Sequence, residues 1–200
     1  SSGFRMCGSP TNPIAYARDL SIREIHRFIL THPDMDHLDG FNACMNAFAV
    51  SNFWDSGSRR QWPDFQSQRF READWERYIK VRDGWESSTS SQVRRAGDLF
   101  EWANAPEGQC DGLHILAPDD ELIHDCNMSD DVNDGSYALL YRVDGSRVVL
   151  PGDAHDKTWA YIRRHYAPAV QDASFLLAPH HGRDSGRSYD FLDLVRPKLT

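Results

Sequence analysis

The sequence predicts a layered α/β fold with mixed β-sheets, and three observations support this class. Apolar runs of strand length alternate along the chain with segments of helical pattern. A β-hairpin sits among them, because Asp144-Gly145 separates two β-rich runs and Asp-Gly is a strong hairpin signal. The run at 174–178 is largely apolar, as in a buried strand. Strands that alternate with helices and include a hairpin build mixed sheets covered by helices.

The individual elements follow from local signals. Asn12-Pro13 is typical of a helix cap with proline in the first turn, which predicts a short helix over 13–20. Predicted strands cover 25–30, 49–54, 113–117, 136–143, 147–150 and 174–178. Further predicted helices cover 38–48, 73–81, 93–103, 157–166 and 189–195.

The stretch at 55–110 differs from the rest of the chain. It is polar, rich in Arg, Gln, Ser and Trp, and carries a Ser-Ser-Thr-Ser-Ser run at 87–91. A segment this short and polar cannot hold its own core. We therefore expect a single domain over residues 1–200 with a polar helical insertion at about 55–110. Aromatic residues beside Arg59 and Arg60 in this insertion can pack or can stack a nucleobase.

The composition narrows the classes of protein. Of 200 residues, 40% are hydrophobic and 26% charged, as in an ordinary globular chain. The net charge of −8 disfavours nonspecific coating of nucleic acid or of an anionic membrane. No run approaches the roughly 18 apolar residues that span a bilayer, so no membrane segment is expected. The four cysteines are scattered, which argues against a thiolate zinc knuckle and fits a reducing, cytoplasmic compartment.

The two ends of the sequence suggest a fragment. The chain begins without an initiator methionine, and its start has no signal-peptide pattern. It stops at Thr200, where a further strand is expected. We expect an excerpt of a longer protein, truncated at one or both ends.

Potential metal ligands concentrate in the loop after the first predicted strand. Four of them lie within six residues, namely His32, Asp34, Asp36 and His37. Imidazole together with carboxylate suits zinc, manganese or iron. A loop this short cannot easily point four donors at one ion, but it can point His32 and Asp34 to one side and the other two to the opposite side. We therefore expect two adjacent cation sites.

Two further segments place donors just after predicted strands. Gly152-Asp153 follows the hairpin, and His180-His181-Gly182 follows the last apolar strand. Strand ends at one edge of a sheet are where α/β proteins place their sites. Asp153 is expected to bridge the two ions, and His181 to complete the second site. Two divalent ions about 3.5–4 Å apart can hold a hydroxide and clamp a phosphate or carbonyl oxygen.

These motifs, His-x-Asp-x-Asp-His, Gly-Asp and His-His-Gly in that order, resemble the metallo-β-lactamase fold superfamily. Aspartate at position 34, where most members have histidine, is similar to the branch that contains the hydrolase domain of the DNA-uptake competence protein ComEC. Asn-Asp-Gly-Ser at 133–136 and Arg-Asp-Ser at 183–185 resemble that branch as well. The resemblance covers about 13–54 and 113–200. It implies an αββα sandwich with a two-metal site.

The resemblance also implies a role for each residue. Asp153 would bridge the ions, and Asp36 would orient the attacking water as the catalytic residue. His181 matches the superfamily's last histidine ligand because it directly precedes Gly182. His180 would then lie just outside the ligands, or would replace His181 if the pair is reversed. The implied metal ligands are His32, Asp34, Asp36, His37, Asp153 and His181.

The chain departs from the family pattern before the hairpin. Many members have a ligand histidine there, whereas this chain has Asn133 and Asp134. One of these two residues, or water, would complete the first site, which would be weaker or would favour manganese over zinc. His155 follows Asp153 by two residues and can contact the metal ligands without binding the ion itself.

Three residues after the last histidines are candidates for substrate binding: Arg183, Ser185 and Arg187. A guanidinium group matches a phosphate with two parallel hydrogen bonds. Ion pairs of the arginines with Asp184 or Asp190 explain them equally well.

Together these residues predict a metal-dependent hydrolase that uses a metal-bound hydroxide, with a phosphodiester of a nucleic acid or nucleotide as the first choice of substrate. Hydrolysis of a lactam, thioester or lactone is the alternative, because the same ions polarise a carbonyl and a fold does not fix its substrate. A third hypothesis is a non-catalytic metal-binding module of a larger protein. The predicted partners are two divalent ions, zinc or manganese, and a phosphate-containing or other small substrate, with nucleic acid included.

Overall fold

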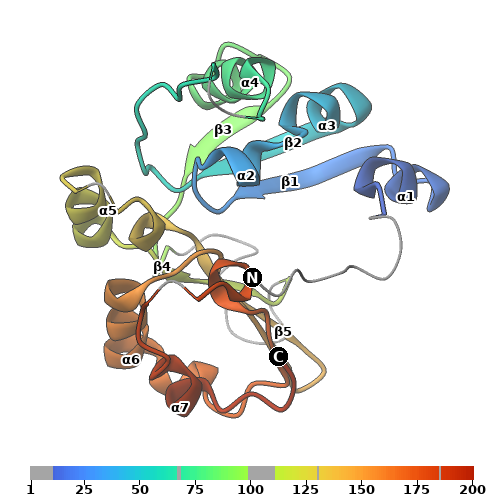
Figure 1. Cartoon of the computed structure of the whole chain (residues 1–200). Helices are drawn as coiled ribbons and strands as arrows, with labels where there is room; N and C mark the ends of the chain where they lie inside the picture. The colour runs from blue at the N-terminus through green and yellow to red at the C-terminus, as the bar shows by residue number, and fades with distance from the viewer. Residues whose placement is uncertain (1–10, 67–68, 99–110, 130, 185) are drawn as a thin grey trace.

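The chain forms two β-sheets with helices beside them, as Figure 1 shows. This computed structural model describes residues 11–66, 69–98, 111–129, 131–184 and 186–200. Within these residues the fold is mixed α/β, with three strands in one sheet and four in the other. The predicted α/β class with mixed strand orientations is confirmed. In the same residues, no helix has both the length and the apolar character that a membrane crossing requires.

The first sheet is parallel throughout and has the order β1-β2-β3. Its strands are β1 (Glu24–Leu30), β2 (Ala49–Asp55) and β3 (Ser90–Val93). Its helices are α1 (Pro13–Asp19), α2 (Met35–Leu38), α3 (Phe41–Ala47) and α4 (Glu72–Arg82). The side chain of Asn12 accepts hydrogen bonds from two amides of α1, which is the cap that the sequence predicts.

The second sheet has the order β4-β5-β6-β7, with β6 and β7 parallel and the other neighbours antiparallel. Its strands are β4 (Leu113–Ala117), β5 (Ala138–Val143), β6 (Ser146–Leu150) and β7 (Phe175–Leu176). Strands β5 and β6 are the hairpin predicted from Asp144-Gly145. The accompanying elements are α5 (Asp120–Asn127), α6 (Asp156–Val170), α7 (Phe191–Val195) and the 3-10 turns η1 (Asn133–Gly135) and η2 (Pro179–Gly182).

Three hydrophobic clusters pack these layers together. One lies between the first sheet and its helices and includes Phe53 and Trp75. A second joins the other sheet to α6 and α7, with Ile162 fully buried. The third brings Trp54 of β2 against Ile115 of β4, so it lies between the two sheets. Burial of such side chains, worth roughly 1.5–3 kcal/mol each, stabilises the layered arrangement.

The segment at 55–110 is built into the first sheet where the structure describes it. Helix α4 contributes Trp75, Tyr78 and Val81 to the cluster that covers this sheet. Strand β3 pairs in parallel with β2. The segment therefore shares a core with the rest of the chain, as its polar composition requires.

Two predicted helices differ from the structure. The helix expected over 38–48 is divided between α2 and α3, because Gly40 takes a left-handed conformation with φ of 87°. The prediction of a helix over 93–103 is wrong for the residues that the structure describes. Val93 is the last residue of strand β3, and residues 94–98 are not helical. Residues 99–103 lie outside the described part.

The last strand is shorter than expected, and one helix was not expected. Only Phe175–Leu176 of the run at 174–178 is a strand, because the chain turns into η2 at Pro179. The unexpected helix is α5, which is capped by Asp119, whose carboxylate accepts a hydrogen bond from the Leu122 amide at 2.9 Å.

Candidate metal centre

The candidate ligands meet where strands of both sheets end. His32 follows β1, and the next turn begins α2 with Asp36 and His37. Asp153 lies three residues after β6, and His180 lies in η2 after β7. Two sets of side chains have ligand atoms within 4.8 Å of one another: His32, His37 and Asp153, and Asp36, His37 and His181.

His32 presents a buried ring nitrogen without a partner. The residue is fully buried, and its Nδ1 atom lies 3.1 Å from Ser136 Oγ. Its Nε2 atom has no hydrogen bond and lies 3.9 Å from both Asp34 Oδ2 and Asp153 Oδ2. Burial, followed by the nearby His37, lowers the pKa of His32 to about 3. A neutral imidazole nitrogen that faces two carboxylates matches what a divalent cation requires.

His37 and His181 form the second part of the group. Their Nε2 atoms lie 3.1 Å apart. His181 Nε2 is also 3.3 Å from Asp36 Oδ2, and His37 Nε2 is 3.2 Å from Asp153 Oδ1. Burial alone would lower the pKa of His37, but the hydrogen bond and charge of Asp153 outweigh it and raise that pKa. Two imidazoles and two carboxylates thus converge on one small volume.

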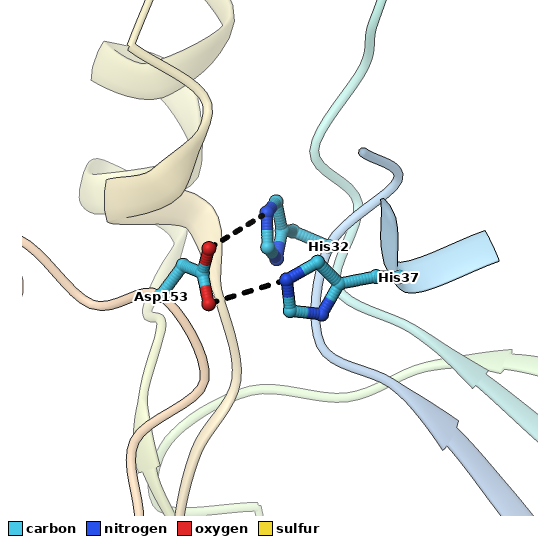
Figure 2. A group of neighbouring side chains, drawn as sticks. All are labelled: His32, His37 and Asp153. Atoms are coloured by element: carbon cyan, nitrogen blue, oxygen red, sulfur yellow. Dashed lines mark ion pairs between the residues drawn. The ribbon is translucent and has the colours of Figure 1, made fainter. Parts of the chain in front are cut away.

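The carboxylate of Asp153 is shared between both parts, as Figure 2 shows for His32 and His37. Its Oδ2 atom lies 3.8 Å from His180 Nε2 and 3.5 Å from His181 Nε2. Burial alone would raise the pKa of Asp153, but the hydrogen bond and charge of His37, followed by His32 and His181, outweigh it and lower that pKa. An ionised carboxylate among four imidazoles can bridge two cations.

The backbone of η2 turns sharply to present both of its histidines. His180 has φ 48° and ψ 47°, and His181 has φ 58° and ψ 17°. Gly182 follows with φ 69°. Left-handed conformations cost a residue with a Cβ atom roughly 1–2 kcal/mol each. Such strain persists where the surroundings fix it and is found at ligand sites.

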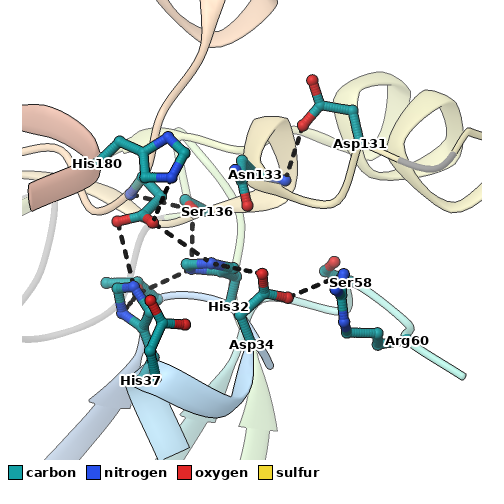
Figure 3. Close-up of polar contacts among 12 residues, drawn as sticks. His32, Asp34, His37, Ser58, Arg60, Asp131, Asn133, Ser136 and His180 are labelled. Atoms are coloured by element: carbon teal, nitrogen blue, oxygen red, sulfur yellow. Dashed lines mark hydrogen bonds and ion pairs between the residues drawn. The ribbon is translucent and has the colours of Figure 1, made fainter. Parts of the chain in front are cut away.

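A chain of hydrogen bonds supports His180 from behind. Its Nδ1 atom lies 2.8 Å from His155 Nε2, and His155 Nδ1 lies 3.0 Å from Asp131 Oδ2. Asn133 Nδ2 is 3.2 Å from His155 Nε2, the nitrogen that also faces His180. Figure 3 shows the 3.2 Å hydrogen bond that the Asn133 backbone amide donates to Asp131 Oδ1, with His180 on the other side of Asn133. His155 therefore contacts the candidate ligand His180 directly, and Asn133 contacts His155.

Other predicted residues make no described contact with the Asp153 carboxylate. Asp134 is buried and accepts hydrogen bonds from the amide and hydroxyl of Thr158, at 3.0 and 2.9 Å. Arg187 pairs with Asp131 at 2.7 Å, a partner that was not among those expected for it. Arg183 is exposed. Ser185 lies outside the described residues.

Four neighbours of the centre were not among the predicted site residues. Thr31 Oγ1 lies 3.2 Å from His32 Nδ1, and Ser136 Oγ lies 3.1 Å from the same nitrogen. Asp131 supports His155, and Arg60 pairs with Asp34 Oδ1 at 3.0 Å. Each of these contacts except that of Thr31 joins residues more than twenty positions apart, so local patterns do not reveal them.

The sequence of this chain matches no protein-family model and no curated protein. What the site can do therefore follows from its side chains. Four imidazoles and three carboxylates lie around one partly buried volume. This set of donors can hold one or two divalent cations.

Proposed function

We propose that this protein is a metal-dependent hydrolase with a dinuclear centre of zinc or manganese, and that it cleaves phosphodiesters. The fold that goes with this proposal is a metallo-β-lactamase-like αββα sandwich, related to the branch that contains the ComEC hydrolase domain. One observation carries it above the others. The Asp153 carboxylate lies within 3.9 Å of ring nitrogens of His32, His37, His180 and His181.

Each ion would have its own ligands and share Asp153. His32, Asp34 and His180 would hold the first ion, so His180 takes the place of the histidine that the family carries before the hairpin. Asp36, His37 and His181 would hold the second. The unpartnered, buried Nε2 atom of His32 supports this assignment, because such an atom is costly without a ligand.

The chain's own residues suit hydrolysis. Divalent ions, when bound, lower the pKa of a water molecule and stabilise negative charge on a phosphoryl oxygen. Asp36 is half-exposed, lies 3.3 Å from His181 and lines the open cavity next to the centre. Its carboxylate can accept a proton from an attacking water while Asp153 keeps the histidines in place.

A phosphodiester fits better than a carbonyl substrate because cationic side chains border the centre. Arg60 pairs with the candidate ligand Asp34, and Arg59 lines the same cavity. Guanidinium groups bind phosphate oxygens with charge-assisted hydrogen bonds. Lactams, thioesters and lactones do not need two such groups.

The first test is metal content. Elemental analysis of the purified chain after zinc or manganese loading is expected to give two ions, and Asp34→Ala is expected to give one. Asp172→Ala is the matched control, because Asp172 is an exposed aspartate that pairs only with Arg196 among the described residues. Equal metal content in wild type and Asp34→Ala would contradict the divided ligand set.

The second test is turnover. Bis(4-nitrophenyl) phosphate is offered with manganese or zinc, in parallel with a lactam, a thioester and a lactone. We expect diester hydrolysis that chelation abolishes and that Asp153→Ala reduces by at least 100-fold. Faster turnover of the lactam, thioester or lactone would contradict phosphodiesters as the substrate and would identify that carbonyl compound as the substrate class. One tightly held ion with no turnover of any substrate would identify a non-catalytic module.

A further inference from the structure

A large cavity begins where the candidate metal centre ends. It has a volume of about 700 Å³, in the range of small-molecule sites. Its lining includes Asp34, Asp36, Arg59, Arg60, Trp62 and Met128. Because Asp34 and Asp36 belong to both the centre and the cavity wall, a molecule in the cavity would lie beside the reacting position.

The two oxygens of Asp34 connect the cavity to the centre. Oδ2 lies 3.9 Å from His32 Nε2, on the side of the metal ligands. Oδ1 lies 3.0 Å from Arg60 Nη1, so the guanidinium is held at the boundary between them. This pair engages one nitrogen of a group with five N–H donors, and the Arg60 side chain is 41% exposed. Arg60 can therefore bind an anion in the cavity while it stays paired.

Arg59 is held in place by a buried acid. Its Nη1 atom lies 2.8 Å from Asp55 Oδ1, and Asp55 also accepts a hydrogen bond from the Tyr78 hydroxyl at 2.7 Å. The Arg59 amide donates to Asn127 Oδ1 at 2.7 Å, which ties this segment to the end of α5. The Arg59 side chain remains 45% exposed at the cavity. Two guanidinium groups thus line one cavity in fixed positions.

Trp62 adds an aromatic surface to the same cavity. Its ring is 56% exposed and meets the fully buried Trp75 edge to face, with 6.2 Å between centroids. The buried ring restricts the orientation of the exposed one. Met128, which is 77% exposed, lines the cavity as well. Large apolar side chains exposed beside two arginines are typical of a site that stacks an aromatic ligand.

The charges of the cavity fit an anion when the centre carries metal. Its two carboxylates, Asp34 and Asp36, balance its two guanidinium groups. Divalent ions on those carboxylates would leave the arginines in excess. A bound anion is then attracted both by the guanidinium groups and by the centre.

We propose that this cavity is a nucleotide subsite, in which Arg59 and Arg60 bind a phosphate and Trp62 stacks the base. The inference rests on the proposed function for its link to hydrolysis, and it names the substrate class as a nucleotide unit. That unit is either a free nucleotide or part of a single-stranded nucleic acid. Both sources offer the same phosphate and the same aromatic ring.

Calorimetric titration of the zinc-loaded protein tests the subsite by binding alone. Adenosine 5′-monophosphate is compared with ribose 5-phosphate, which has the phosphate but no base. We expect the nucleotide to bind at least 10-fold more tightly, since stacking on an aromatic side chain commonly contributes this much. Equal affinity for the two probes would overturn the proposal, because metal and arginine contacts to phosphate are common to both.

Variants assign the base preference to one ring. Trp62→Ala is expected to remove the difference between the two probes, and Arg60→Gln is expected to weaken both by about 10-fold. Trp85→Ala is the matched control, because Trp85 is 73% exposed and does not line this cavity. A base preference that persists in Trp62→Ala would also overturn the assignment.

An oligodeoxyadenylate of ten nucleotides distinguishes the two sources. Binding at least 10-fold tighter than the mononucleotide supports single-stranded nucleic acid, and weaker or equal binding supports a free nucleotide. The subsite and the proposed function fail in different ways. Base-dependent binding without hydrolysis of bis(4-nitrophenyl) phosphate contradicts the hydrolase alone, and hydrolysis without base-dependent binding contradicts the subsite alone.

Discussion

His155 Nε2 lies 2.8 Å from His180 Nδ1, and this contact fixes the tautomer of His180. Asp131 can only accept, so His155 carries a proton on Nδ1, and the Asn133 amide nitrogen can only donate, so His155 Nε2 is an acceptor. His180 must then donate from Nδ1. Its Nε2 lone pair consequently points at the Asp153 carboxylate, 3.8 Å away. Burial lowers the pKa of His180, which keeps the ring neutral.

Removal of the acid behind His155 is expected to weaken metal binding without touching a ligand. Asp131→Ala removes the acceptor that keeps the His155 proton on Nδ1. The ring of His180, which is oriented by His155, is then no longer fixed. Loss of such an outer partner typically lowers metal affinity 10- to 100-fold. A zinc titration against a chromophoric chelator measures this. Asp125→Ala, an exposed aspartate paired with Lys157, is the control and should bind zinc like the wild type.

Metal is expected to stabilise the folded chain through Asp153. Zinc at one hundred times its dissociation constant would add about 2.7 kcal/mol to the free energy of unfolding, because the ion binds only the folded state. Thermal unfolding with zinc and with chelator measures the difference. In Asp153→Asn the zinc-dependent rise should disappear. A rise of equal size in that variant would show that zinc binds elsewhere.

Asp134 is expected to matter for stability and not for metal. Its Oδ1 atom accepts from the Thr158 amide and hydroxyl at the start of α6, and the hydroxyl alone has a second described acceptor, the backbone carbonyl of Asp134. Asp134→Ala should therefore lower the free energy of unfolding by about 1–3 kcal/mol, since the buried Thr158 amide loses its partner. Urea unfolding measures the loss. Metal content should stay at the wild-type value, and a drop would return Asp134 to the ligand set.

Acid is expected to destabilise the metal-free chain through His32. The pKa of this buried imidazole is about 3 in the fold and about 6.5 when unfolded, so the unfolded state binds the proton first. The contribution of His32 is complete above pH 6.5 and is lost as the pH falls toward 3. The loss amounts to about 2 kcal/mol at pH 5.

Urea unfolding at pH 7 and pH 5 checks this in chelator. The loss of stability between the two values should be smaller by about 2 kcal/mol in His32→Gln than in the wild type. The raised pKa of His37 acts in the opposite direction and is common to both proteins. The same loss in both would mean that His32 is protonated in the fold.

Local signals were sufficient for the elements that carry the candidate ligands. The apolar run before His32, the Asp144-Gly145 turn and the strand before Pro179 predicted β1, the hairpin and β7. Because donors follow each of these strands directly, their convergence could be expected from the sequence.

Structure that depends on distant contacts could not be predicted in this way. Strand β3 (Ser90–Val93) is polar and lacks an alternating pattern, so only its pairing with β2 makes it a strand. The support of His155 by Asp131 crosses 24 positions, and Arg60 reaches Asp34 across 26. Such pairs are set by how the layers dock, and a single sequence does not encode them as a local pattern.

The division of the ligands between the sheets has a consequence for folding. His32, Asp34, Asp36 and His37 come from the first half of the chain, whereas Asp153, His180 and His181 come from the second. Each sheet is contiguous in sequence, so each half can form its own strand pairs before the two associate. A tight metal complex requires both halves together. Metal uptake followed in time during refolding would therefore report the final docking of the two halves, separately from the secondary structure that precedes it.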